Sequence, residues 1–146
     1  WMTQDKKSKT TDELLRLLSQ TSRMEDFLDK HGDDLSELHP ADYLRQMLTQ
    51  HRMSKQDALK AANLDYSLGY QIFNGYRKPS RNALLRLALA MGLSLDETQR
   101  LLKIAQRGEL YPKARRDAAI LFCIQNRMDV FDADILLEKI GEELLD

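Results

Sequence analysis

The sequence is poor in the residues that build cross-linked or membrane proteins. It holds one cysteine, three prolines, six glycines and one tryptophan in 146 residues. A single cysteine excludes an intramolecular disulfide, so nothing favours an oxidising compartment. No apolar run approaches the roughly 20 residues that a membrane-spanning helix needs, and the polar first ten residues lack the apolar stretch of a signal peptide. We therefore expect a cytoplasmic protein with no membrane contact.

Residues that catalysis or metal binding would need are also sparse. The three histidines have no metal-ligand spacing with each other or with Cys123, and no glycine-rich phosphate loop occurs. Cys123 lies in an apolar stretch and is expected to be a small buried side chain. The sequence therefore predicts a protein that is not an enzyme and that carries no metal or cofactor.

Charge is nearly balanced overall but unevenly distributed. The formal net charge is −1, which is low for a nucleic-acid-binding protein, because affinity rests on neutralising phosphates. Residues 51–86 hold seven basic and two acidic residues, a net of +5. Residues 11–50 hold four basic and nine acidic residues, and residues 127–146 hold two and seven, so each flank has a net of −5. The pattern indicates either a basic binding region or a chance segregation of solvated charge.

Apolar residues recur at helical spacing, and capping residues mark the expected helix starts. Two acidic helices are predicted near 10–18 and 24–28. Further helices are predicted at about 41–51, 54–63, 65–75, 80–91, 94–108, 113–125 and 131–140, with Pro112 at a helix-start position. Thr10 with Glu13, and Ser94 with Glu97, have the spacing of a capping box. No segment alternates convincingly between polar and apolar residues, so the predicted fold class is all-α.

The central segment carries the most specific pattern. In residues 53–80 the features are Ser54 at a helix start, a turn at Asn63-Leu64, a cap at Asp65, then Ile72-Phe73-Asn74-Gly75 and the exit Arg77-Lys78-Pro79-Ser80. The run Leu84, Leu87-Ala88, Met91-Gly92 and Ser94-Leu95-Asp96-Glu97 follows. Over about residues 39–105 this pattern resembles the lambda-repressor-like (Cro/repressor, XRE-type) helix-turn-helix family.

The resemblance implies a domain organisation. Residues 39–108 would be a five-helix, lambda-repressor-like DNA-binding domain. Residues 1–38 would form a flexible tail with acidic N-terminal helices, and residues 109–146 a C-terminal helical hairpin packed on the central domain. An α-helix fits the major groove of duplex DNA, so the second motif helix would be the recognition helix.

The same resemblance assigns roles to individual residues. Lys55 would clamp a phosphate at the start of the first motif helix. Tyr66, Ser67 and Gln71 would lie at base-reading positions, with Tyr70 also on the outward face, and Gln71 could pair with adenine. The positions that contact phosphates in the family are occupied here by Asn74, Tyr76, Arg77 and Lys78.

Each assignment has a plainer alternative. Tyr66 and Tyr70 lie four residues apart, so they could pack together or against another group instead of contacting bases. Gln71 could be merely solvated, and Arg77 and Lys78 could be ordinary loop charges. The recognition helix has no Arg or Lys from Tyr66 to Asn74, which disfavours tight, guanine-rich recognition.

Two positions differ from the family pattern and are expected to compensate one another. The first motif helix usually has a small residue where this chain has Leu59, and the second usually has Val or Ile where it has Gly69. These positions face each other across the turn in the family. A large side chain opposite a missing one conserves volume, so we expect Leu59 to contact the backbone of Gly69.

The C-terminal segment is similar in sequence to part of the central segment. Residues 81–102 align without gaps with residues 116–137, at an offset of 35. Ser94 corresponds to Asp129, and Leu101-Leu102 to Leu136-Leu137. The alignment indicates either a repeated helix–turn–helix shape or a chance similarity of amphipathic helices. The apolar faces of the last two helices need a partner in either case.

These patterns favour a regulator that binds double-stranded DNA as a homodimer. The alternative is an adaptor or antitoxin-like module that has the same fold and binds a protein partner through its acidic flanking helices. The near-zero net charge favours the alternative, whereas Lys55 and the Arg77-Lys78 exit favour DNA.

Overall fold

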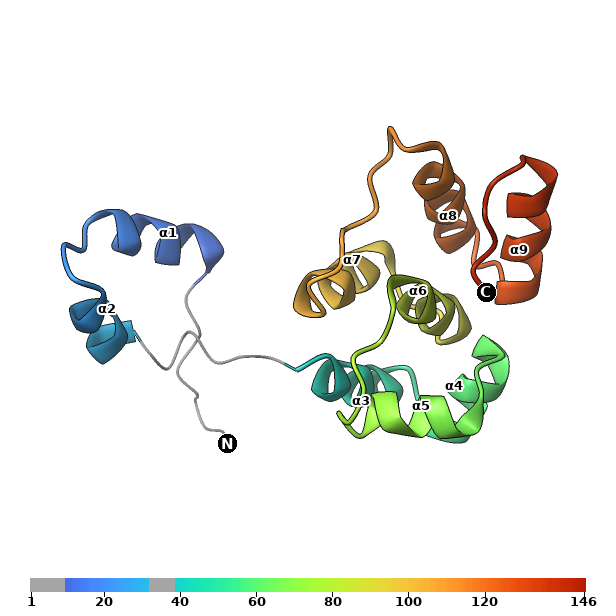
Figure 1. Cartoon of the computed structure of the whole chain (residues 1–146), viewed down its shortest axis with the longest axis horizontal. Helices are drawn as coiled ribbons and strands as arrows, with labels where there is room; N and C mark the ends of the chain where they lie inside the picture. The colour runs from blue at the N-terminus through green and yellow to red at the C-terminus, as the bar shows by residue number, and fades with distance from the viewer. Residues whose placement is uncertain (1–9, 32–38) are drawn as a thin grey trace. The chain divides into compact units, whose positions relative to one another are not determined.

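The computed structural model describes residues 10–31 and 39–146. The chain divides into two compact units, Trp1–Glu37 and Leu38–Asp146. All regular secondary structure in the described residues is helical, which confirms the all-α prediction (Figure 1). The helices are α1 (Thr11–Ser19), α2 (Met24–His31), α3 (Pro40–Gln50), α4 (Lys55–Ala62), α5 (Tyr66–Phe73), α6 (Arg81–Ala90), α7 (Leu95–Ile104), α8 (Arg115–Gln125) and α9 (Val130–Lys139).

The N-terminal unit contains α1 and α2. Thr10 and Glu13 form the predicted capping box, in which the Glu13 amide donates to Thr10 Oγ1 at 3.1 Å. Leu15 and Met24 are exposed, whereas Phe27 is buried. The tail that was predicted to be flexible, residues 1–10, lies outside the described residues except for its last position.

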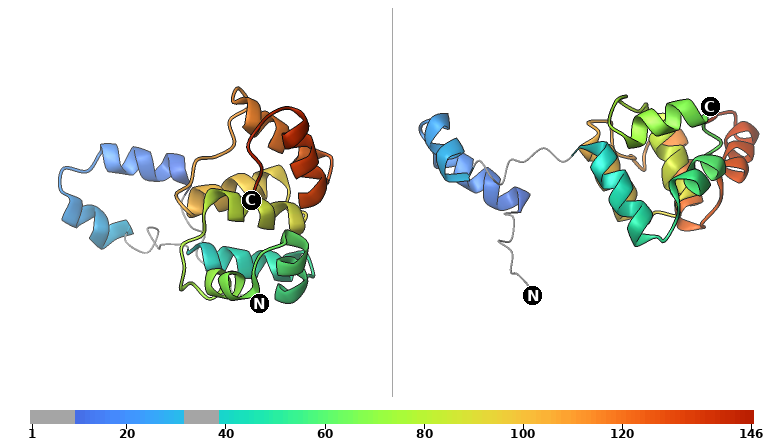
Figure 2. Two further views of the ribbon diagram at one scale, coloured as in Figure 1. Left: turned by 45° about the vertical axis from the view of Figure 1, so that its right-hand side comes forward. Right: turned by 90° about the horizontal axis from the view of Figure 1, so that it is seen from below.

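The larger unit has three layers. α6 and α7 lie between α3–α5 on one side and α8–α9 on the other (Figures 1 and 2). α4 packs on α6, and α3 packs on both α5 and α7. α6 is buried around its whole circumference from Ala83 to Leu89, as expected of a central helix.

The sequence predicted the N-cap residues of the helices better than it predicted where each helix begins and ends. Ser54, Asp65, Ser80 and Ser94 all cap the expected helices through their side chains. The prediction that Pro112 opens a helix at Lys113 was wrong.

α8 begins at Arg115, and its N-cap, Ala114, offers no side-chain hydrogen bond. A turn closed by the Ala114 amide and the Tyr111 carbonyl, at 3.0 Å, precedes it. The helix predicted to extend to about residue 108 ends at Ile104, because Gln106 has a left-handed backbone, with φ +57°.

Residues that are 35 positions apart in the aligned segments also have equivalent backbone conformations. Gly92 and Arg127 both have positive φ, and so do Gln106 and Gly141. The Leu93 amide donates to the Ala88 carbonyl at 3.0 Å. At the equivalent positions of the second half, the Met128 amide donates to the Cys123 carbonyl, also at 3.0 Å. The correspondence extends beyond the aligned segment, to residues 81–110 and 116–145.

Two arginines make equivalent hydrogen bonds in the two halves. Arg81 and Arg116 stand 35 residues apart at the starts of α6 and α8, and each donates through Nε and Nη2 to two consecutive carbonyls. The acceptors are Gly108 and Glu109 for Arg81, and Glu143 and Leu144 for Arg116. These acceptor pairs are also 35 residues apart, so the recurrence favours a true repeat over chance similarity.

The two halves also bind each other reciprocally. Arg81 binds Asp117 of the second half at 2.9–3.0 Å, and Arg116 binds Asn82 of the first half at 3.1 Å. α6 likewise contacts α9, while α7 contacts α8. Reciprocal pairing relates residues 81–110 and 116–145 by an approximate two-fold rotation within one chain. Within the described part of the chain, no helix is long and apolar enough to cross a bilayer.

Candidate functional site

The candidate site is built on α4, the turn after it and α5. Ser54 Oγ accepts from the Asp57 amide at 3.0 Å, and Asp65 Oδ2 accepts from the Leu68 amide at 3.2 Å, so both helix starts are capped. Asn63 ends α4 with φ +54°, the left-handed conformation that the sequence predicted for the turn. A short turn of this kind sets the direction in which α5 projects.

α5 has one buried face and one exposed face. Gly69, Ile72 and Phe73 are buried in the core of the larger unit. The three residues assigned to base reading, Tyr66, Ser67 and Gln71, are exposed, and so is Tyr70, which was expected on the outward face. The structure therefore gathers them on one outward surface, whose side chains carry no charge.

Tyr66 and Tyr70 are stacked on that surface. Their ring centroids are 5.9 Å apart with an interplanar angle of 23°. The rings pack on each other, as the plainer alternative proposed, yet they remain 43% and 41% exposed. Lys55 Nζ lies 5.2 Å from the centroid of the Tyr70 ring, a cation–π distance. The tyrosine pair thus forms an ordered surface that is still open to a ligand.

The residues expected at phosphates lie beside this surface. Asn74 is the C-cap of α5, and its Oδ1 accepts from Lys55 Nζ at 3.5 Å. Tyr76 is 84% exposed, and Arg77 and Lys78 are exposed on the loop that leaves the helix. The Tyr76 amide donates to the Gln71 carbonyl at 2.9 Å, which ties the start of this loop to α5.

Sequence reasoning missed the arginines that hold these elements in place. Arg86 is buried, and it donates to the carbonyls of Ala62 at 2.9 Å and Asn63 at 2.6 Å, at the α4–α5 turn. Arg107 donates to the Pro79 carbonyl at 2.8 and 3.1 Å, at the end of the basic loop. The only sequence signal for Arg86 was a lone charge within the apolar run of α6.

The +5 count for residues 51–86 therefore overstates the charge available to a ligand. Arg86 is engaged with backbone carbonyls in the interior, and Arg81 is paired with Asp117. The exposed or partly exposed basic residues that remain in this range are Arg52, Lys55, Lys60, Arg77 and Lys78. Arg77 and Lys78 lie on the loop after α5, and the Arg77 amide donates to the Gln71 carbonyl at 3.3 Å.

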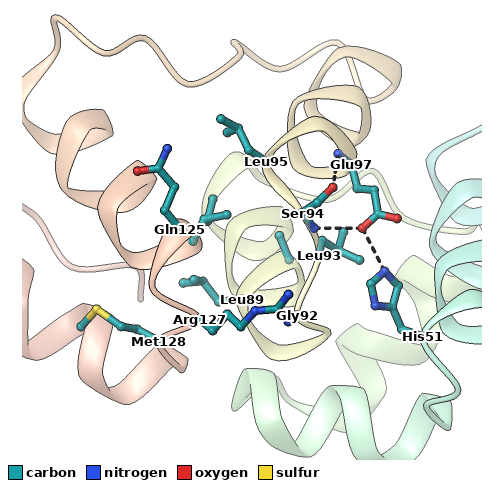
Figure 3. Close-up of a pocket in the computed structure, with 12 residues that line it drawn as sticks. His51, Leu89, Gly92, Leu93, Ser94, Leu95, Glu97, Gln125, Arg127 and Met128 are labelled. Carbon is teal, nitrogen blue, oxygen red and sulfur yellow. Dashed lines mark hydrogen bonds and ion pairs between the residues drawn. The ribbon is translucent and has the colours of Figure 1, made fainter.

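A cavity of about 440 Å³ lies where the two halves of the repeat meet (Figure 3). Its lining includes three pairs of equivalent residues: Leu89 and Ile124, Gly92 and Arg127, Leu93 and Met128. The cavity is therefore a feature of the approximate two-fold axis.

Two residues that line this cavity, His51 and Glu97, interact with each other, as the dashed line in Figure 3 marks. His51 Nε2 lies 2.9 Å from Glu97 Oε1. Burial alone would raise the pKa of Glu97, but hydrogen bonds from the Ser94 backbone and from His51 outweigh it and lower the pKa below its usual value. The pair ties the end of α3 to the start of α7. It is a structural contact within the larger unit and it is not part of the α5 surface.

In the two described stretches of the chain, no cluster of three or more His, Cys, Asp or Glu side chains could hold a metal ion. Cys123 is buried, and burial raises the pKa of its thiol above the usual value. Comparison of the chain with protein-family models, curated proteins and solved structures gives no match.

Proposed function

We propose that the protein binds double-stranded DNA in a sequence-specific manner, with α5 as the recognition helix. The observation that carries this proposal is the exposed, uncharged face of α5 beside an exposed basic loop. A single helix presenting polar and aromatic side chains suits the major groove, and adjacent cations suit the phosphates.

The division of labour follows from the chemistry of each group. Tyr66, Ser67, Tyr70 and Gln71 contact base edges. Arg77 and Lys78 on the exit loop, with Lys55, Asn74 and Tyr76 beside them, contact the DNA backbone. Acidic residues elsewhere in the chain leave the net charge near zero, so DNA affinity depends on this local grouping of cations.

The resemblance noted in the sequence supports the same function. α3–α7 would be the five helices of a lambda-repressor-like domain, flanked by α1–α2 and by the α8–α9 hairpin. The protein would act as a transcriptional regulator in the cytoplasm and bind as a homodimer, with one recognition helix in each half-site.

The test is the salt dependence of binding by the full chain to a pool of random-sequence duplex DNA. We expect affinity to fall linearly with salt on logarithmic axes. Replacing Lys55, Arg77 and Lys78 together with Ala should reduce the slope by roughly one unit for each phosphate that is no longer neutralised.

The matched control replaces Lys103, Lys113 and Lys139 with Ala. It also removes three positive charges, but from exposed positions outside α4, α5 and the exit loop. The control should retain the original salt slope. Equal slopes in both variants would place the DNA elsewhere, and no duplex binding by the original chain would overturn the proposal.

A second candidate function is protein binding, because the C-terminal hairpin exposes large apolar side chains. Phe131 is 72% exposed, and Phe122 and Ile135 are about half exposed. Exposed apolar side chains that lie in one contiguous patch are typical of a contact surface. A stable complex with a second protein, formed without any measurable duplex affinity, would favour the adaptor or antitoxin-like alternative.

A further inference from the structure

We infer that the stacked Tyr66–Tyr70 pair reads the C5-methyl group of pyrimidines in the major groove. The site would then prefer A·T pairs, and it would bind 5-methylcytosine more tightly than unmethylated cytosine. This inference rests on the proposed DNA binding and names the class of sequence that the α5 surface selects.

The side chains on α5 decide which base edges it can read. Guanine is recognised best by Arg or Lys, and cytosine by the carboxylate of Asp or Glu. The exposed face of α5 contains neither kind of residue. It contains Gln71, whose amide matches adenine, and two aromatic rings, which match the thymine methyl group. Both matches belong to the same base pair.

The geometry gives the ring pair the properties of a methyl-binding surface. The two rings are nearly parallel, and both remain partly exposed, Tyr66 by 43% and Tyr70 by 41%. Lys55 lies over the Tyr70 ring, and its ammonium also donates to Asn74 Oδ1, so Lys55 restrains the Tyr70 ring. A side chain that is already ordered loses little conformational entropy on binding.

Two of the proposed phosphate contacts, Arg77 and Lys78, come from a different segment of the chain than the rings, whereas Lys55 lies over the Tyr70 ring. Tyr66 and Tyr70 lie one turn apart on one face of α5, and Gln71 is the exposed residue that follows Tyr70. The exposed cations follow on the loop after Gly75, beyond the end of the helix. Base reading by the rings and backbone binding by Arg77 and Lys78 can therefore be changed independently.

The experiment starts from duplexes that the full chain selects from a random pool. At each A·T pair of the selected site, thymine is replaced by uracil, which differs only by the missing methyl group. At the positions that respond, a G·C pair carrying cytosine is then compared with one carrying 5-methylcytosine. We expect uracil to weaken binding about fourfold at each methyl that the rings touch, the ratio produced by burying one methyl group. The added cytosine methyl should strengthen binding by a similar ratio.

Two variants assign the effect to the tyrosine pair. Tyr70→Ala should reduce the thymine-to-uracil ratio toward one while retaining the salt slope, whereas Tyr70→Phe, which keeps the ring, should retain the ratio. Should Tyr70→Ala fail to fold, the comparison of thymine with uracil in the original chain still decides the inference.

The possible outcomes distinguish a failure of methyl reading from a failure of the proposed DNA binding. Duplex binding with equal affinity for thymine and uracil overturns methyl reading and leaves DNA binding intact. A selected site made only of G·C pairs overturns it as well. Tighter binding to a single-stranded pool would mean that the rings stack on unpaired bases. No binding to any duplex overturns both proposals.

Discussion

Leu59 occupies the space that a side chain at position 69 would fill. A Cβ atom built on Gly69 would lie 2.7 Å from Leu59 Cδ1 and 2.9 Å from Cγ, with Cδ2 nearer still. Leu59 is fully buried. The contact expected from the sequence is therefore confirmed, and it joins α4 to α5 at the centre of the candidate site.

Replacing Gly69 with Val should destabilise the protein by overpacking. The free energy of unfolding should fall by about 1–3 kcal/mol, measured by urea denaturation, because both helices are fixed by their caps and by the core. Helix propensity acts in the opposite direction, since Gly within a helix costs about 0.5–1 kcal/mol relative to Ala.

Two further variants isolate the steric cause. Gly108→Val is the control, because a Cβ there meets only Arg81 Nε, at 4.0 Å, and stability should change little. The double variant with Gly69→Val and Leu59→Ala should be more stable than the sum of the two single effects predicts, because the smaller residue 59 leaves room for the valine. A double variant no more stable than the additive sum of both changes would contradict the compensation.

Local features of the fold were predictable from the sequence, whereas distant contacts were not. Ser54, Asp65 and Asn63 act on residues within a few positions, so their roles follow from capping chemistry. Arg81 and Asp117 are 36 positions apart, and nothing local links them. The helix start near Pro112 was misplaced because Pro112 lies in a turn that the Ala114 amide and the Tyr111 carbonyl close. The preceding residue, Leu110, is hydrogen-bonded to Gln99.

The candidate site was predictable to a similar extent. The exposed residues on α5 follow from helical periodicity once Asp65 is identified as the cap. The stacking of Tyr66 on Tyr70 remained open, since both packing and exposure were consistent with their spacing. The role of Arg86 was hidden because a sequence count treats every arginine as solvated charge.

Arg81 and Arg116 occupy equivalent positions, but we expect them to contribute differently to the free energy of unfolding. Arg81→Ala leaves the buried Asp117 carboxylate without its main partner, which typically costs about 3–5 kcal/mol. Arg116→Ala leaves the neutral amide of Asn82, so the destabilisation should be smaller, about 1–3 kcal/mol. Chemical denaturation of both variants measures the difference. Equal destabilisation would mean that the carboxylate contributes nothing beyond the carbonyl hydrogen bonds that both arginines make.

Arg86 should couple the stability of the core to the geometry of the candidate site. Arg86→Met keeps most of the side-chain volume but removes the donors for the Ala62 and Asn63 carbonyls. Stability should fall by about 1–3 kcal/mol, because the carbonyl of the buried Ala62 and the partly buried carbonyl of Asn63 both lose a partner. If DNA binds, affinity should fall as well, since the α4–α5 turn loses its support. Lys103→Met, at an exposed position, is the control and should change neither quantity.

Asp117 should make stability depend on pH in the acid range. Burial alone would raise the pKa of its carboxyl group, but the Arg81 hydrogen bond, the Tyr111 amide and the charges of Arg81 and Arg116 outweigh burial and lower it. A carboxyl group with a lowered pKa in the folded state stabilises the protein above its unfolded pKa of about 3.9. That stabilisation disappears as the pH falls toward the folded pKa.

Replacing Asp117 with Asn should therefore lower stability at neutral pH and flatten the decline in unfolding free energy below about pH 4, the region where an unfolded Asp titrates. The matched variant is Asn82→Asp at the equivalent position in the other half of the repeat, where Arg116 lies 3.1 Å from the side-chain oxygen. It should create a second charge pair and steepen the same decline. Denaturation curves collected from about pH 2.5 to 7 bracket the titration of an unfolded Asp and measure both effects. An acid limb that is identical in all three proteins would show that neither Arg81 nor Arg116 selects the ionised carboxylate of its partner.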